Sequence, residues 1–281
     1  MKFNVSGKLT YDVREASTII LNIHAIRSAA QTVLQESFMM EPYFKAEELI
    51  PVQGENRYVR FEVTEPCIVN IDYNALIDTS FKKIAGHSLN DVPVMQLQPS
   101  VLPYLSPSRY CQSDKLFRFA NSRFGKIENS FEKVLALTNW IYDNVEYLSG
   151  STNSETSAYD TVTEQAGVCR DFAHLGIALC RALSIPARYF TGYSYQLNPP
   201  DFHACFEAFL GDQWILFDAT KLAPLNGMVK IATGRDAADT AIATIFGNVI
   251  CTAISASCEL AEEKFKPYTY DRKKPRGLSY L

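Results

Sequence analysis

Three side chains suited to nucleophilic catalysis occur in order along the second half of this sequence. Cys169 lies in the segment GVCRDFAH (residues 167–174), which predicts a turn followed by the first residues of a helix. His203 begins an alternating strand, and Asp218 lies near the end of the next one. A thiol, an imidazole and a carboxylate are the parts of a cysteine nucleophile, so they indicate acyl transfer through a thioester.

The expected role of each group follows from its chemistry. The amides of a helix N-terminus and a neighbouring imidazolium both favour a thiolate, so Cys169 gains from both. We expect His203 to act as general base and acid, and Asp218 to fix the tautomer and orientation of the imidazole. The backbone N–H of Cys169 and one further donor, for which Gln165 is a candidate, would stabilise the oxyanion of a tetrahedral intermediate.

The pairing of His203 with Asp218 depends on a tight hairpin turn predicted at residues 211–212. A loop with an even number of residues centred there places Cys205 opposite Asp218 and His203 opposite Thr220. His203 and Asp218 are then diagonal neighbours on one side of the sheet, with Cα atoms roughly 7–8 Å apart. A loop with an odd number of residues would place the two side chains on opposite faces.

Metal binding is the competing use of these residue types. Cys169, His203, Cys205 and Asp218 could together ligate one zinc ion. However, the sequence has no CxxC pair, and Cys169 and Cys180 lie too far apart along one helix to share an ion. We therefore predict no metal and no cofactor, and keep a metal-binding protein as the disfavoured alternative.

Length, composition and charge restrict the class of protein. The chain has 281 residues, 47% of them hydrophobic, and a net charge of −4; these values are typical of a globular protein with one large or two smaller domains. The negative charge argues against a nucleic-acid or anionic-membrane partner. Seven scattered cysteines disfavour a disulfide framework, and the start lacks an apolar run of signal-peptide length. We therefore expect a cytoplasmic protein.

The pattern of strands and helices predicts an α+β protein in two parts. Four β-prone runs cover residues 2–13, 17–26, 57–63 and 67–73. The last two alternate at period two, which is typical of a sandwich or curved sheet. The proline-studded segment 92–108 then indicates a connection between domains. We predict a β-rich accessory domain over residues 1–115 and a catalytic domain over residues 116–281.

The second part begins with helical patterns and continues with strands. An apolar stripe predicts a helix from residue 129, with Ser130 as its N-cap. The cysteine helix is predicted over residues 169–183, and the strands after it at 187–193, 203–209 and 214–218. Residues 240–258 carry no charge and are long enough to span a membrane. Gly247-Asn248 interrupts them, so two buried strands joined by a turn are the better interpretation.

Several other reactive side chains are predicted to be structural. Cys180, Cys251 and Cys258 are interpreted as packing residues. His174 lies off the nucleophile's face of the helix, so we expect it to make a structural hydrogen bond. Trp140 is expected to pack in the interior.

The sequence resembles the transglutaminase-like superfamily in its bacterial branch. The matching blocks are residues 104–110, 167–174, 202–204, 217–220 and 234–239. The N-terminal β region is similar to the accessory domain of these bacterial proteins. The resemblance implies a papain-like core in which a cysteine-bearing helix packs on an antiparallel sheet. It also implies Cys169 as nucleophile, His203 as base and Asp218 as orienting carboxylate.

The resemblance extends to two further residues and to the range of possible reactions. Asp171 and Arg235 lie in matching blocks, and we predict that both are buried and hold the walls of the site. Members of the superfamily include protein cross-linkers, peptidases, amidases, deglycosylating enzymes and catalytically silent relatives. No EF-hand loop is present, so calcium activation is not indicated. We predict a thiol hydrolase or acyltransferase acting on a peptide or protein amide; a silent binding module is the alternative.

Overall fold

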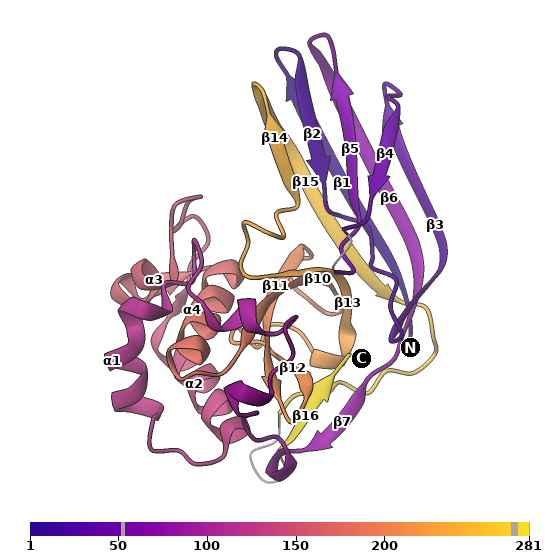
Figure 1. Cartoon of the computed structure of the whole chain (residues 1–281). Helices are drawn as coiled ribbons and strands as arrows, with labels where there is room; N and C mark the ends of the chain where they lie inside the picture. Colours follow the sequence, from indigo (N-terminus) through magenta and orange to yellow (C-terminus); the bar gives the residue numbers. More distant parts are fainter. Residues whose placement is uncertain (52–53, 271–274, 281) are drawn as a thin grey trace.

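Two groups of elements make up the molecule: long strands at one end, and helices gathered around a shorter sheet at the other (Figure 1). This computed structural model describes residues 1–51, 54–270 and 275–280. The mixture of helices with antiparallel sheets confirms the predicted α+β class.

The strands of the first group form two four-stranded antiparallel sheets. Their bounds are β1 (Lys2–Val13), β2 (Ser17–Leu21), β3 (Gln31–Glu41), β4 (Ala46–Leu49), β5 (Tyr58–Val63), β6 (Cys67–Thr79), β14 (Ala243–Phe246) and β15 (Val249–Leu260). One sheet has the order β15-β1-β6-β3 and the other β14-β2-β5-β4. Alternate residues of β1, among them Phe3, Val5 and Tyr11, are buried in a common core with Ile19 and Phe61. The predicted sandwich-like unit is therefore present.

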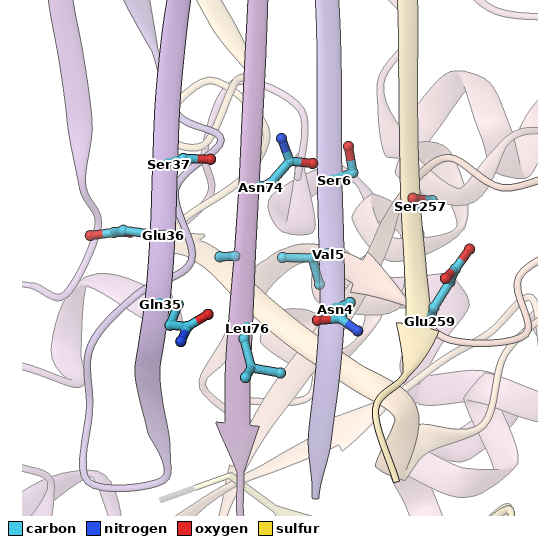
Figure 2. A pocket seen from close by; sticks show the side chains of 11 residues that line it. Asn4, Val5, Ser6, Gln35, Glu36, Ser37, Asn74, Leu76, Ser257 and Glu259 are labelled. Carbon is cyan, nitrogen blue, oxygen red and sulfur yellow. The ribbon is translucent and has the colours of Figure 1, made fainter.

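The outer face of the sheet that contains β1 carries a row of polar residues. Ser37, Asn74, Ser6 and Ser257 lie opposite one another in a row across four strands. Together with neighbours such as Glu259 they line a shallow hollow of about 550 Å³ (Figure 2). None of the three predicted catalytic residues lines it.

Residues 240–258 do form two strands joined by a turn, with Gly247 at φ +136°. The prediction that both strands are buried was wrong. β14 and β15 lie at the edges of different sheets, and β15 is exposed from Ile250 to Ser255. The domain boundary near residue 115 stays a prediction, but these two strands show that the C-terminal segment completes the N-terminal sheets. No helix in the described part of the chain is long and apolar enough to cross a membrane.

The second group of elements is a four-stranded antiparallel sheet with helices against it. The helices are α1 (Ser113–Phe124), α2 (Ser130–Asn144), α3 (Ala158–Glu164) and α4 (Cys169–Ala182). The strands are β10 (Ala187–Ser194), β11 (Phe202–Leu210), β12 (Gln213–Phe217) and β13 (Met228–Gly234), in the order β12-β11-β10-β13. Asn129, rather than Ser130, caps α2. Its side chain accepts a 2.9 Å hydrogen bond from Glu132 N, whereas the hydroxyl of Ser130 donates to Asp91.

Short elements connect these parts. The paired strands are β7 (Lys82–Ala85) with β16 (Arg276–Ser279), and β8 (Glu146–Tyr147) with β9 (Ala166–Gly167). The 3-10 helices are η1 (Gly86–Ser88), η2 (Val94–Gln96), η3 (Leu102–Leu105) and η4 (Leu225–Gly227). The sandwich core continues into the central sheet through Tyr193, Phe202 and Val229. The two groups therefore share apolar surface rather than being joined by a free linker.

The packing of α4 on β11 fixes the helix that carries Cys169. Ala204, Phe206 and Ala208 of β11 belong to one buried cluster with Ala173 and Ile177 of α4. At Gly176 the two elements approach so closely that an added Cβ would lie 2.5 Å from the ring of Phe206. A side chain at this crossing point therefore requires the ring of Phe206 to shift.

We predict that Gly176→Ala destabilises the protein by about 1–3 kcal/mol, because the methyl group overpacks the contact with Phe206. Urea unfolding measures the free energy. Helix propensity alone favours alanine over glycine by about 1 kcal/mol, so the two effects have opposite signs. The control is Phe206→Leu in the Gly176→Ala background, which should recover part of the loss. Unchanged or increased stability of Gly176→Ala would contradict the close packing.

Candidate active site

Cys169 is the first residue of α4, as predicted, and its side chain is half-buried. The first amides of an α-helix have no intrahelical partner and carry the positive end of the helix dipole. The Cys169 thiol therefore lies where backbone N–H groups favour a negative charge. Asp171 caps this end of the helix, because its carboxylate accepts a 3.0 Å hydrogen bond from Val168 N.

The structure brings His203 and Asp218 together as the hairpin argument required. β11 and β12 pair with Leu210 opposite Gln213 and Phe206 opposite Phe217, which is the register of a two-residue loop. His203 Nε2 lies 2.9 Å from Asp218 Oδ2, and both side chains are buried. This bond leaves Nδ1 of His203 available, and the thiols of Cys169 and Cys205 both interact with the imidazole.

The charge state of the pair follows from its burial and its partners. Burial acts to lower the pKa of His203, but the interactions with Cys205 and with the carboxylate of Asp218 outweigh it and raise that pKa well above its ordinary value. Burial likewise acts to raise the pKa of Asp218. The His203 charge and the donors of Thr220, at 2.8 and 2.7 Å from Oδ1, lower it instead. The imidazole beside Cys169 is therefore cationic at neutral pH.

Cys205 adds a second thiol to this cluster. His203, Cys205 and Asp218 are buried and offer ligand atoms within 4.8 Å of one another, which makes them a candidate metal-binding group within the described residues. Burial raises the pKa of the Cys205 thiol to about 12. Cys205 is thus a neutral thiol at neutral pH, and a metal ion that bound it would displace its proton. The hydrogen bonds of His203 and Asp218 account for the cluster without an ion.

Asp171 is buried and holds one wall of the site, as predicted. Its carboxylate accepts a 2.8 Å hydrogen bond from Thr152 Oγ1 and pairs with Arg170 at 2.9 Å. The Ser/Thr-rich loop before α3 is thereby tied to the start of α4.

The same prediction was wrong for Arg235. Its side chain is 54% exposed and pairs with Asp239 on the surface. The buried residue of this block is its neighbour Asp236, which accepts hydrogen bonds from the backbone N–H groups of Tyr110 and Ala238. A block of matching sequence does not show which of its charged residues points inward.

The other reactive side chains have mixed outcomes. His174 is buried and accepts a 3.1 Å hydrogen bond from Ala237 N, which confirms a structural role. Cys180 is buried as predicted, and the half-buried Trp140 packs against the core with its ring centroid 5.0 Å from that of Phe119.

Two residues depart from expectation. Cys251 is exposed, because it lies in the uncovered part of β15, so its interpretation as a packing residue was wrong; Cys258 is half-buried. Gln165 is exposed where α3 ends, and its backbone carbonyl accepts from Glu146 N. Among the described residues no hydrogen bond joins its side chain to Cys169.

Tyr147 is the site residue that sequence reasoning missed. β8 pairs in parallel with β9 so that Tyr147 stands opposite Gly167, two residues before Cys169. Its hydroxyl interacts with the thiol and the backbone N–H of Cys169, and burial together with Cys169 raises the pKa of this phenol. In the sequence, Tyr147 is only a tyrosine that follows the apolar pattern of the α2 helix. The residues around it do not predict that two residues here pair in parallel with a distant segment.

The chain is similar to known proteins over most of its length. A family model described as "Bacterial transglutaminase, N-terminal domain" matches residues 1–100, and one described as "Transglutaminase-like superfamily" matches residues 118–219. The crystal structure of a "Putative Cysteine Protease from Cytophaga hutchinsonii" is 56% identical, with a TM-score of 0.98. The match covers 100% of this chain and 98% of that one.

Two curated mycobacterial proteins are more distant. The uncharacterized protein ML0607 of Mycobacterium leprae is 25% identical over 173 residues, which cover 59% of this chain and 61% of that protein. The uncharacterized protein Rv2569c of Mycobacterium tuberculosis is 32% identical over 118 residues, covering 37% of this chain and 38% of that protein. The chain therefore spans less than two thirds of the length of either relative.

The geometry predicts a reactive thiol. We expect iodoacetamide to alkylate Cys169 rapidly near pH 6, because the cationic imidazole of His203 and the helix N-terminus favour the thiolate. His203→Ala should slow the reaction at that pH by roughly tenfold or more. Peptide mass spectrometry measures labelling at each cysteine, and exposed Cys251 is the internal control. A slow alkylation rate at Cys169 that rises only near pH 8.5 and is unchanged in His203→Ala would contradict a thiolate–imidazolium pair between Cys169 and His203.

Proposed function

Because this chain belongs to the transglutaminase-like superfamily, we propose that it is a thiol-dependent hydrolase or acyltransferase acting on an amide bond of a peptide or protein. One observation carries the proposal: Cys169, at a helix N-terminus, interacts with a buried His203 whose Nε2 lies 2.9 Å from Asp218 Oδ2. The "Putative Cysteine Protease" of Cytophaga hutchinsonii, which matches over the whole chain, supports the same reaction class.

The proposed reaction uses the groups in the protonation states derived above. The Cys169 thiolate attacks the amide carbonyl carbon, a C–S bond forms, and the carbonyl oxygen becomes an oxyanion. His203 then donates its Nδ1 proton to the amine nitrogen as the C–N bond breaks, which leaves a thioester and a neutral imidazole. Water gives a proton to His203 and attacks the thioester, releasing the acid and restoring thiolate and imidazolium. Asp218 stabilises the cationic imidazole throughout.

We assign the oxyanion hole to Cys169 N–H and Tyr147 Oη–H. The amide belongs to the first helical residue, so it has no partner within the helix. The hydroxyl of Tyr147 faces that same amide, and its raised pKa keeps it a donor at neutral pH. An oxygen that enters between the two can accept from both, which is the arrangement that stabilises a tetrahedral intermediate.

Hydrolysis is preferred to transfer onto an amine, because water is always available as second nucleophile and no residue group in the described part of the chain marks a site for an amine acceptor. The runner-up function is a catalytically silent binding module with the same fold. The complete triad weighs against it, since a silent relative is free to lose any of the three residues.

A chromogenic ester tests for acyl-enzyme formation. We expect p-nitrophenyl acetate to give a burst of p-nitrophenol and to add the mass of one acetyl group at Cys169, because the thioester forms before water attacks. Cys169→Ala should abolish both signals, while Cys251→Ala, which removes an exposed thiol, should leave them unchanged. A silent module would acetylate Cys169 no faster than Cys251. Hydroxylamine or a primary amine is then added to distinguish hydrolysis from transfer. Hydrolysis releases acetate, whereas transfer gives the acetylated amine.

The oxyanion assignment predicts a specific loss in Tyr147→Phe. Removing one such donor typically costs 10²–10³-fold in rate, so we expect the acylation rate to fall by about 10²-fold. Because the ring is kept, the contact with Phe172 at 5.8 Å between centroids should persist. Iodoacetamide alkylation has no oxyanion, so it should change little in this variant. An acylation rate within about twofold of the original protein would remove Tyr147 from the assignment.

A further inference from the structure

A small cavity of about 250 Å³ borders the catalytic carboxylate. Its lining comes from three parts of the chain: α2, the segment that follows β12, and the segment that precedes β16. The lining residues are Leu135, Thr138, Asn139, Asp218, Lys221, Ala223, Leu225, Thr269 and Tyr270. Neither Cys169 nor His203 lines the cavity, but Asp218 does, so the cavity adjoins the proposed active site.

The polar groups in the cavity wall are already paired within the fold. Asp218 Oδ2 lies 2.9 Å from His203 Nε2, and Oδ1 accepts two further hydrogen bonds at 2.8 and 2.7 Å. The hydroxyls of Thr138 and Tyr270 each donate to a backbone carbonyl. A charged ligand therefore finds no unpaired group among them, and it would lose its hydration without compensation.

The rest of the interior is apolar. Ala223 and Leu225 are 5% and 4% exposed and belong to a buried cluster against which the ring of Tyr270 packs. Leu135 packs against the neighbouring cluster that includes α4. An apolar cavity of about 150 Å³ holds a benzene molecule, so this cavity accommodates the side chain of phenylalanine or leucine. It is smaller than the cavities of about 300–1,000 Å³ that bind drug-sized ligands.

The more exposed residues of the lining suit a peptide backbone. Asn139 is half-buried, and its side-chain amide makes no hydrogen bond within the described part of the chain. A side-chain amide has donors and an acceptor, which are the groups that pair with a peptide bond. Lys221 is exposed, and its Nζ lies 3.9 Å from the centroid of the Tyr142 ring, so its charge is held at the surface.

We propose that this cavity binds one large apolar side chain of a peptide substrate, aromatic or branched, while Asn139 contacts the peptide backbone. The proposal rests on the proposed function, because it places that side chain near the amide that Cys169 attacks. The imidazole of His203 and the carboxylate of Asp218 separate the thiol from the cavity. An extended peptide advances about 3.3–3.6 Å per residue, so about two or three residues span that separation.

Direct binding tests the site without any need for activity. In isotope-labelled Cys169→Ala protein, we expect acetyl-Gly-Phe-Gly-amide to bind at least tenfold more tightly than acetyl-Gly-Ala-Gly-amide, because its ring leaves water for an apolar cavity. In NMR titrations the amide signals of Asn139 and Ala223 should shift, whereas that of Leu34 on β3 should not. Acetyl-Gly-Glu-Gly-amide should bind no better than the alanine peptide. Equal affinity for the three peptides, or no shift at Asn139 and Ala223, would overturn the proposal.

A variant of the cavity wall identifies where the side chain binds. Leu135→Asn should weaken binding of the phenylalanine peptide by about fivefold, because it replaces an apolar contact with a polar one. The matched control is Leu34→Asn, at a leucine of β3 that is 44% exposed, and this variant should bind normally. Thermal unfolding checks that each variant folds. If Leu135→Asn does not fold, the comparison of the peptides decides, and an unchanged preference for phenylalanine in folded Leu135→Asn would refute the site.

The burst with p-nitrophenyl acetate distinguishes failure of this site from failure of the proposed function, because the acetyl group has no large side chain to fill the cavity. A burst together with equal peptide affinities would retain the thiol enzyme and reject the site. Binding that depends on phenylalanine in a protein that gives no burst would reject the enzyme and retain the cavity as a peptide-binding site.

Discussion

The contact between α4 and β11 is the interaction on which the rest of the molecule depends. The nucleophile belongs to the helix, whereas the base and its carboxylate belong to the sheet, so neither element contains a site by itself. Where α4 crosses β11, the ring of Phe206 lies so close to Gly176 that a side chain at this position of the helix would overlap with it. This contact sets the height of α4 above the sheet, and with it the distance from Cys169 to His203. Core packing and site geometry are thus one constraint.

Burial of the His203–Asp218 pair makes stability depend on pH in a defined direction. The pKa of His203 is raised in the folded state, so its contribution is fully present below the unfolded value near 6.5 and is lost as the pH rises through the folded pKa. The pKa of Asp218 is lowered, so its contribution is present above the unfolded value near 3.9 and is lost as the pH falls. The pair therefore stabilises the fold most strongly in mildly acidic to neutral solution.

The parts of the fold and of the site that could be predicted from the sequence are those that depend on residues close together in the chain. The turn at residues 211–212 determined the register of β11 with β12, and the register determined that His203 and Asp218 meet. The α+β class and the start of α4 at Cys169 were predicted from the spacing of apolar residues and from turn residues, which also involve only nearby positions in the sequence. Each of these features depends on a few neighbouring residues, so each could be predicted from the sequence alone.

What could not be predicted depended on contacts between distant segments. Tyr147 reaches Cys169 only because β8 pairs with β9 across an intervening helix. Arg235 and Asp236 are adjacent charged residues, and only the tertiary position of Tyr110 decides that the second is buried. The exposure of β15 likewise depends on how far the facing sheet extends, which the apolar sequence of the strand does not reveal.

The composition of β11 brings these arguments together. All nine residues from Phe202 to Leu210 are buried, a pattern that normally selects apolar side chains throughout. Yet His203, Cys205 and Glu207 occupy alternate positions, so they project from one face while the opposite face packs on α4. Burying ionised groups is costly unless each is paired, and both His203 and Glu207 are paired within the fold. β11 therefore accepts this cost at two points, four residues apart, and at each point the partner that pays for it comes from another strand or loop of the same fold.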